Sequence, residues 1–177
     1  MKMTIERINP DNAKDINKMD GTFSIDARLS LYLEDDEIGY KVAKIPKSKK
    51  RYRADEFDEK TYMDDPDKTI FLAYVDSQIA GQIILRKNWN NYAYIEDIAV
   101  DAKFRRQGVG KELISWAKQW ARQQNLAGIM LETQNNNVPA CKFYERCGFR
   151  LAGFDQYLYK GLDPETQEIA LYWYLLI

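Results

Sequence analysis

The sequence predicts an α/β protein with one mixed sheet, and three observations support this prediction. First, an apolar, β-branched run at residues 94–100 leads through a turn with two glycines into a helical pattern at residues 111–124. Second, another apolar strand follows at residues 127–133, and strand–helix–strand order implies a parallel pair with a right-handed crossover. Third, antiparallel hairpins are predicted over residues 69–85 and 149–177.

Composition places the chain among globular proteins of one domain. It has 177 residues, of which 45% are hydrophobic and 13% aromatic, which suffices for a sizeable core. A net charge of −1 gives no reason to expect a nucleic-acid partner. There is no apolar run long enough to span a membrane and no apolar core of a signal peptide. We therefore expect a cytoplasmic protein that binds neither nucleic acid nor membrane.

Histidine and cysteine usage limits the chemistry. The chain contains no histidine, which removes histidine-based triads and zinc sites, and no metal is expected. A general base must then be a carboxylate, a tyrosine, a lysine or a water relay. The two cysteines, Cys141 and Cys147, fall on different faces of a predicted helix. Reduced thiols are expected.

The first third of the chain has weaker signals. Residues 4–8 alternate as a first strand, and residues 9–17 predict a helix of about two turns. A second helical segment is predicted over residues 21–40. The basic residues 41–53 and the acidic residues 55–67 predict a long solvated connection. Alternatively, the acidic residues attract a cationic substrate.

The remaining elements have clearer boundaries. Residues 69–75 and 78–85 predict strands, and the two residues between them predict a hairpin. Pro139 and Gly148 mark the start and the end of a short helix. The helical pattern of residues 111–124 has a core-facing stripe, formed by Leu113, Ala117, Trp120 and Ala121.

The turn before residue 111 predicts an anion site. The first amides of a helix have no intrahelical acceptor, and the helix dipole favours negative charge there. Gly108 and Gly110 allow a phosphate to approach the backbone. Positive charge comes from Arg105, Arg106 and Lys111. The pattern fits neither a P-loop nor a dinucleotide fingerprint. The alternative is a basic loop before a surface helix.

Two motifs resemble those of the GCN5-related N-acetyltransferases (GNAT). One is Arg105-x-x-Gly108-x-Gly110, similar to the pyrophosphate-binding motif of that family. The other follows one helix and one strand later and contains Asn137, Ala140, Tyr144, Gly148 and Phe149. The resemblance implies a GNAT fold, a single domain with a mostly antiparallel central sheet, one splayed parallel strand pair and flanking helices. Residues 1–67 would form a variable substrate-side region, and residues 68–177 the acetyl-CoA-binding core.

A closer resemblance, to the streptothricin acetyltransferases, covers residues 68–158. It rests on the stretches 85–90, 92–100, 131–134 and 140–144. The implied reaction transfers acetyl from acetyl-CoA to an amine of the β-lysine moiety of streptothricin, giving antibiotic resistance. The implied substrate is a small cationic amine. A homodimer through the aromatic C-terminal strand is a further expectation.

The resemblance also implies the cofactor contacts. Backbone amides from Arg106 to Lys111 would hold the pyrophosphate, and backbone groups of residues 98–100 would pair with the pantetheine arm. The N–H near Ile98 would polarise the thioester carbonyl. Asn137 would hold the cofactor through its side chain, unless it is only a helix cap. The cofactor-binding residues are then Ile98, Ala99, Val100, Arg105, Arg106, Gln107, Gly108, Val109, Gly110, Lys111 and Asn137.

Catalysis would need a base and an acid. Deprotonating a lysine-like amine at pH 7 costs about 4.6 kcal/mol. Glu96 is the candidate base, because strand alternation places it on one face with Tyr94 and Ile98. A bulge could exchange its role with Asp97, and either residue could instead be a structural carboxylate. Tyr144 is the candidate acid for the departing thiolate, the alternative being a core tyrosine.

Substrate contacts are predicted near the strand ends. Carboxylates and aromatic faces suit a polycation. The candidates are Trp89, Tyr94, Asp97 and Glu132, each of which could equally be a packing or surface residue.

Other functions remain open from sequence. The acceptor could be a protein α-amine or lysine, an aminoglycoside or a polyamine. A non-catalytic acetyl-CoA-binding regulator would keep the phosphate loop, but Tyr144→Phe and Glu96→Gln would leave its function intact. A nucleic-acid module has support only from the basic residues 41–53.

Overall fold

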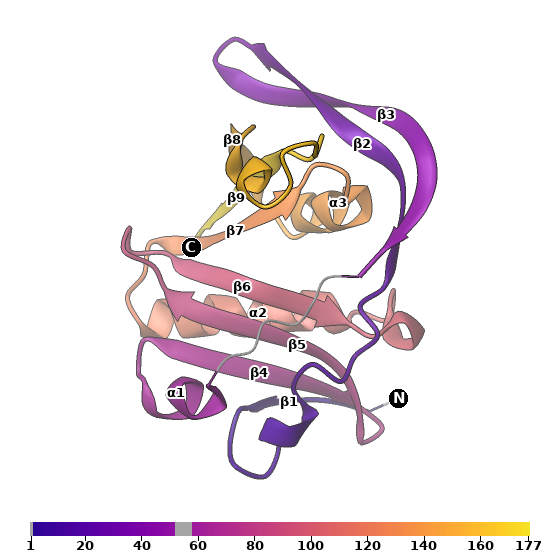
Figure 1. Cartoon of the computed structure of the whole chain (residues 1–177). Helices are drawn as coiled ribbons and strands as arrows, with labels where there is room; N and C mark the ends of the chain where they lie inside the picture. Colours follow the sequence, from indigo (N-terminus) through magenta and orange to yellow (C-terminus); the bar gives the residue numbers. More distant parts are fainter. Residues whose placement is uncertain (1, 52–57) are drawn as a thin grey trace. The chain divides into compact units, whose positions relative to one another are not determined.

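A computed structural model describes residues 2–51 and 58–177 (Figure 1). The chain forms two compact units. The first unit comprises Met1–Thr22, Arg51–Ile129 and Ile177, and the second comprises Phe23–Lys50 and Met130–Leu176. The single-domain organisation stays a prediction.

The first unit contains four antiparallel strands in the order β1-β4-β5-β6. They are β1 (Met3–Arg7), β4 (Lys68–Val75), β5 (Gln78–Lys87) and β6 (Ala93–Val100). The predicted hairpin of β4 and β5 is confirmed, and both linking residues, Asp76 and Ser77, have positive φ. This is the geometry of a two-residue turn that matches strand twist.

The helical elements of the first unit are short except for one. They are η1 (Ala13–Asp15), α1 (Glu59–Asp64), η2 (Ala102–Phe104) and α2 (Val109–Gln123). The predicted helix over residues 9–17 is therefore wrong in length. Asn9 and Asn12 hydrogen-bond nearby backbone amides instead, which competes with a continuous helix.

Both faces of this sheet are covered by apolar side chains. On one face α2 contacts β4, β5 and β6 (Figure 1), and the Trp116 and Phe71 ring centroids lie 5.4 Å apart. The opposite face packs against the N-terminal segment and α1, through the buried cluster of Ile8, Ala13, Ile16, Tyr62, Ile70, Leu72 and Ile84. The predicted stripe on α2 is confirmed, because its four residues are buried.

The second unit contains a long hairpin and the C-terminal elements. Strands β2 (Phe23–Glu34) and β3 (Glu37–Lys50) pair antiparallel, and Figure 1 shows them as a long, curved ribbon. The other elements are β7 (Gly128–Gln134), whose first two residues belong to the first unit, α3 (Val138–Arg146), β8 (Arg150–Asp155), η3 (Leu158–Gly161) and β9 (Ala170–Leu176). Helix α3 contacts β2, and β3 contacts β8.

The hairpin corrects two predictions from sequence. The predicted helix over residues 21–40 is wrong, because Ile25, Ala27 and Leu29 are buried and alternate with exposed residues. That period of two belongs to a strand. The basic residues to Lys50 are not a connection but continue β3. Of the predicted connection, residues 52–57 lie outside the described part of the chain.

Two further expectations can be compared with the structure. Both cysteines are free, as predicted, and Cys141 is buried. Burial raises the pKa of its thiol to about 11, so it is inert as a nucleophile at neutral pH. Within the described residues, no helix has the length and apolar character to cross a membrane.

Candidate active site

The turn before α2 has the geometry of an anion site. Gly108 caps the helix with φ 89°, a left-handed conformation that favours glycine. The first intrahelical bond is donated by the amide of Glu112 to the carbonyl of Gly108, at 3.0 Å. The amides of Val109, Gly110 and Lys111 therefore have no acceptor within the helix. With the helix dipole, they can hold a phosphate group.

The charged side chains of this turn have different surroundings. Arg106 and Lys111 are exposed. Arg105 donates from Nε to the carbonyl of Val100 at 3.2 Å and from Nη2 to that of Asp20 at 3.3 Å. The Asp20 carbonyl also accepts from the amide of Ala102. Arg105 thus fastens the turn to the end of β6, and no sequence pattern indicates the contribution of Asp20.

Strand β6 contains a bulge, a possibility that the sequence analysis considered for the roles of Glu96 and Asp97. Its register passes from Leu85↔Ile95 to Ile84↔Asp97, which leaves Glu96 as the extra residue. Tyr94 pairs with Arg86, but Ile98 pairs with Ile83, on the other face of β5. The prediction that Glu96 shares one face with both Tyr94 and Ile98 is therefore wrong, because the extra residue breaks the alternation.

Glu96 is held by two neighbours. The Tyr62 hydroxyl donates to Oε2 at 2.5 Å, and Arg86 Nε donates to Oε1 at 3.1 Å. Arg86 also lies over the Tyr94 ring, 4.6 Å from its centroid. Burial, then the hydrogen bond to Glu96 and the negative charge of Glu96, raise the pKa of Tyr62 well above its usual range, so its hydroxyl stays protonated. Both oxygens of Glu96 are thus engaged in structural interactions.

Asp97 belongs to a different polar network. Its Oδ2 accepts from Gln82 Nε2 at 2.6 Å, and the same Gln82 amide binds both the backbone and the side chain of Asn17. Gln82 is only 1% exposed. Asp97 therefore helps to fix the N-terminal segment on the sheet. Trp89, by contrast, is 92% exposed, so the packing alternative does not hold for it.

Helix α3 carries the second motif. Asn137 Oδ1 accepts from the amide of Ala140 at 3.4 Å, so its side chain does act as the helix cap. Tyr144 is 6% exposed, and its ring lies 5.7 Å from that of Phe149 and 6.3 Å from that of Trp173, centroid to centroid. The packing fixes the direction of the Tyr144 ring.

Glu132 on β7 has the most unusual electrostatics of the candidate residues. Its side chain is partly buried, and no hydrogen bond or ion pair joins it to another described residue. Burial, and secondly the charge of Glu168, raise its pKa from 4.5 to about 7. Such a carboxyl group changes its protonation near neutral pH, which is the property of a general base or acid.

The turn between β7 and α3 is fixed by a residue that sequence reasoning missed. Asn135 is 3% exposed and makes four hydrogen bonds. Its backbone and side chain bind Leu29 on β2 at 2.8 and 3.2 Å, and Ile169 before β9 at 2.9 and 3.0 Å. These two pairs of hydrogen bonds fix the segment between Glu132 and Asn137. The three consecutive asparagines at residues 135–137 are typical of a turn, and this pattern does not indicate the contacts of Asn135.

Residues 31–149 match the model of the acetyltransferase (GNAT) family. The chain belongs to this family. Its fold accordingly has a mixed sheet, mostly antiparallel with one parallel pair, and three helices. The predicted fold class and acetyltransferase activity are confirmed.

Individual relatives extend the similarity over most of the chain. Streptothricin acetyltransferase A of Bacillus subtilis (strain 168) is 38% identical over 164 residues, which are 92% of this chain and 94% of that protein. A crystal structure from Bacillus anthracis (strain Ames), assigned as a streptothricin acetyltransferase and in complex with acetyl coenzyme A, is 48% identical with a TM-score of 0.94. The match covers 99% of this chain and 100% of that one. A nourseothricin acetyltransferase structure is 30% identical, with a TM-score of 0.81 and 98% coverage of both chains.

Proposed function

We propose that this acetyltransferase transfers acetyl from acetyl-CoA to an amine of streptothricin, in its β-lysine moiety, and so inactivates the antibiotic. The observation that carries the proposal is the similarity, at 48% identity over the whole chain, to the Bacillus anthracis protein that binds acetyl coenzyme A. The Bacillus subtilis streptothricin acetyltransferase supports the same substrate. A cytoplasmic location and a homodimer through the C-terminal strand stay predictions.

The cofactor contacts follow from the turn before α2. The amides of Val109, Gly110 and Lys111 receive the pyrophosphate, and the exposed side chains of Arg106 and Lys111 add positive charge. Residues 98–100 of β6 offer backbone groups to the pantetheine arm. Arg105 acts differently, because its guanidinium is bound to backbone carbonyls and holds the turn in place.

For the base, the structure favours Glu132 over Glu96. Both oxygens of Glu96 accept hydrogen bonds, one of them from a cation. Glu132 has no such partner among the described residues, and its pKa of about 7 makes it an effective proton acceptor at physiological pH. We therefore assign the removal of the amine proton to Glu132 in place of Glu96, which we regard as a structural carboxylate. Trp89, Tyr94 and Asp97 stay the proposed substrate contacts.

The chemical step then has a complete proton balance. The neutral amine attacks the thioester carbonyl, and the carbon–sulfur bond breaks as the tetrahedral intermediate collapses. The proton of the amine passes to Glu132, directly or through water. Tyr144 donates its hydroxyl proton to the departing CoA thiolate. Glu132 then releases the accepted proton to solvent, and a proton from solvent restores Tyr144.

The first experiment measures CoA release by the purified protein. The acceptors are streptothricin, aminoglycosides, polyamines and lysine-bearing peptides, and acetyl-CoA binding is measured in parallel by calorimetry. We expect turnover on streptothricin. Turnover confined to peptides would contradict the assignment of streptothricin as substrate, although acetyl transfer from acetyl-CoA would still hold. Cofactor binding without turnover on any acceptor would instead support a regulator.

A further inference from the structure

We propose that Asp101 is a positioning residue for acetyl-CoA, because its carboxylate holds the turn before α2 in the conformation that binds the pyrophosphate. The proposal rests on the assignment of the pyrophosphate to that turn. Asp101 directly follows β6 and directly precedes η2, so it joins the strand proposed for the pantetheine arm to the turn. It is only 8% exposed, which is unusual for an aspartate. A buried carboxylate needs hydrogen-bond partners, and these partners indicate its role.

Both carboxylate oxygens of Asp101 accept hydrogen bonds from backbone amides. Oδ1 accepts from the amide of Lys103 at 3.1 Å and thereby caps η2. Oδ2 accepts at 3.1 Å from the amide of Asp20, which belongs to the N-terminal segment 81 residues earlier. The backbone of Asp101 also donates to the Ala80 carbonyl and accepts from the Phe104 amide, both at 2.9 Å. Asp101 therefore ties η2 to β5 and to the N-terminal segment.

The backbone of Asp20 transmits the effect of Asp101 to the turn. The Asp20 carbonyl accepts from the amide of Ala102 at 3.2 Å and from Nη2 of Arg105 at 3.3 Å. In the described part of the chain, Asp101 and Arg105 form no ion pair with each other. The link is indirect: the Asp101 carboxylate fixes the backbone of Asp20, and the Asp20 carbonyl fixes the guanidinium of Arg105.

The conformation of the turn explains why it needs this support. Two of its residues have left-handed backbone angles, Arg106 with φ 64° and Gly108 with φ 89°. Arg106 is not a glycine, and such a conformation persists only where the surrounding contacts hold it. If the contacts to Asp20 are lost, the turn can relax. The amides of residues 109–111 are then no longer aimed at a phosphate group.

The direction of the effect separates positioning from simple electrostatics. A carboxylate beside an anion site repels phosphate, so by charge alone the removal of Asp101 should tighten the binding of acetyl-CoA. A positioning role predicts the opposite result, which is weaker binding. A measured dissociation constant therefore distinguishes the two explanations by its sign.

The main variant is Asp101→Ser, because serine also caps a helix but is too short to reach Asp20 as well. We expect the dissociation constant of acetyl-CoA, measured by calorimetry on the full chain, to rise about tenfold. The kcat at saturating acetyl-CoA should change less than about twofold, because the role of Asp101 is in binding. Arg105→Gln should weaken binding less than about twofold further in the Asp101→Ser background, because both side chains act through Asp20.

A matched control comes from a second aspartate that caps a short helix. Asp58 Oδ1 accepts from the amide of Lys60 at 3.0 Å and caps α1, while Oδ2 accepts from the hydroxyl of Thr61 at 3.0 Å. Asp58→Ser makes the same chemical change in the same kind of cap. It should leave the dissociation constant of acetyl-CoA unchanged, because α1 does not contact the turn before α2 through this cap.

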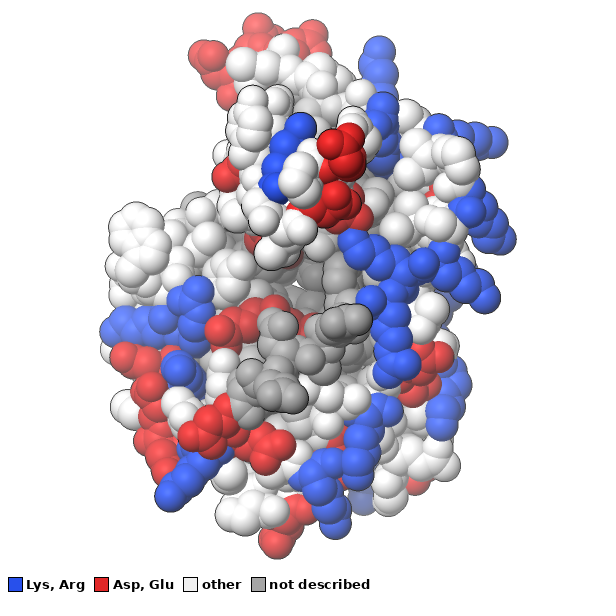
Figure 2. All heavy atoms as spheres, in the orientation of Figure 1, with Lys and Arg blue, Asp and Glu red and all other residues white. Residues whose placement is uncertain are grey.

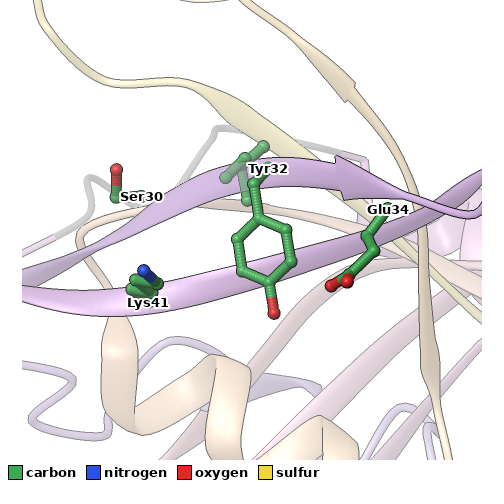
Figure 3. A pocket seen from close by; sticks show the side chains of 5 residues that line it. Ser30, Tyr32, Glu34 and Lys41 are labelled. Atoms are coloured by element: carbon green, nitrogen blue, oxygen red, sulfur yellow. The ribbon is translucent and has the colours of Figure 1, made fainter.

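A further control removes a carboxylate from the second unit. Glu34 is exposed at the end of β2, and Figure 2 shows acidic side chains at this end of the hairpin. Figure 3 shows it beside a hollow of about 360 Å³ lined by Ser30, Leu31, Tyr32, Glu34 and Lys41. Glu34→Ser changes the net charge as Asp101→Ser does, and it should leave acetyl-CoA binding unchanged.

Hydrogen exchange in the wild type tests the proposal without any substitution. The amides of Asp20 and Ala102 should exchange at least about threefold more slowly when acetyl-CoA is bound, because the cofactor stabilises the ordered turn. Exchange of these amides that ignores the cofactor would overturn the proposal. So would an unchanged or lower dissociation constant in Asp101→Ser, the same loss in either control, or additive effects of Asp101→Ser and Arg105→Gln.

The exposed cations show which assignment has failed if the result is negative. If Arg106→Gln and Lys111→Gln weaken acetyl-CoA binding but Asp101→Ser does not, only the role of Asp101 is wrong. If none of the three variants weakens binding, the assignment of the pyrophosphate to the turn before α2 is wrong as well.

Discussion

Glu96 and Glu132 are both strand glutamates beside motifs of the same family, yet their surroundings differ in kind. Glu96 lies at a bulge of β6, where Tyr62 and Arg86 bind its two oxygens. Glu132 lies on β7 with no such partner among the described residues, close enough to Glu168 that like charge adds to burial in raising its pKa to about 7. The first environment stabilises a fixed anion, and the second a group that exchanges a proton. The comparison shows that carboxylate chemistry depends on neighbours distant in sequence.

The largest effect is expected for Glu132→Gln. Removal of a general base typically costs 10²- to 10⁴-fold, and we expect a loss in kcat/KM of at least about 10²-fold. In the wild type, kcat/KM should fall as pH drops below about 7, because Glu132 becomes protonated. The variant should lack this limb of the pH profile. A steady-state pH series on streptothricin measures both.

Glu132→Gln also tests the raised pKa of Glu132 through a stability measurement that does not depend on catalysis. The folded state binds the Glu132 proton more tightly than the unfolded state does, so its contribution to stability is complete below pH 4.5 and lost as pH rises to about 7. Denaturant unfolding should show that Glu132→Gln removes part of this decline. An unchanged pH dependence would contradict the assigned environment of Glu132.

Tyr144→Phe is expected to have the next largest effect. The variant keeps the ring packing against Phe149 and Trp173 but loses the proton donor for the thiolate. We expect kcat to fall by about 10²-fold with little change in the KM for acetyl-CoA. The matched control is Tyr172→Phe. An active Tyr144→Phe enzyme would leave Tyr144 as a core residue.

Substitutions of the three cationic residues in the turn before α2 should have two kinds of effect on acetyl-CoA binding. Arg106→Gln and Lys111→Gln each remove an exposed charge, so we expect about fivefold to tenfold weaker acetyl-CoA binding and a reduced salt dependence. Arg105→Gln removes a brace from the backbone of Val100 and Asp20. Arg105 is exposed as well, so its loss should reduce the salt dependence in the same way but weaken binding more than the other two substitutions do. Calorimetry at two salt concentrations distinguishes these outcomes.

The smallest effect on turnover is expected for Glu96→Gln. The amide keeps one acceptor oxygen, and we expect a loss of less than about tenfold in kcat/KM and of about 0.5–1 kcal/mol in stability. Tyr62→Phe should cost a similar amount of stability, since it breaks the same contact. If Glu96→Gln were instead more damaging than Glu132→Gln, the two carboxylates would have to exchange roles.

Local sequence by itself determined the geometry of the turn before α2 and most of the sheet. The turn places residue 108 at φ 89°, a conformation that favours glycine because it lacks a Cβ, and α2 starts one residue later. Glycine spacing and the adjacent positive charges were therefore sufficient to predict the position of this turn. Strands β4, β5, β6 and β7 were equally predictable, because their apolar runs are short and bounded by turn residues.

Tertiary structure decided the rest. The bulge at Glu96 follows from pairing with β5, which no local pattern encodes. Residues 21–40 became a hairpin because alternate residues of β2 are buried, overriding a weak helical pattern. Glu132 acquires its pKa from burial and from Glu168, far along the chain. Local geometry can be inferred from residue type and spacing, whereas desolvation and charge coupling depend on which distant residues the fold brings together.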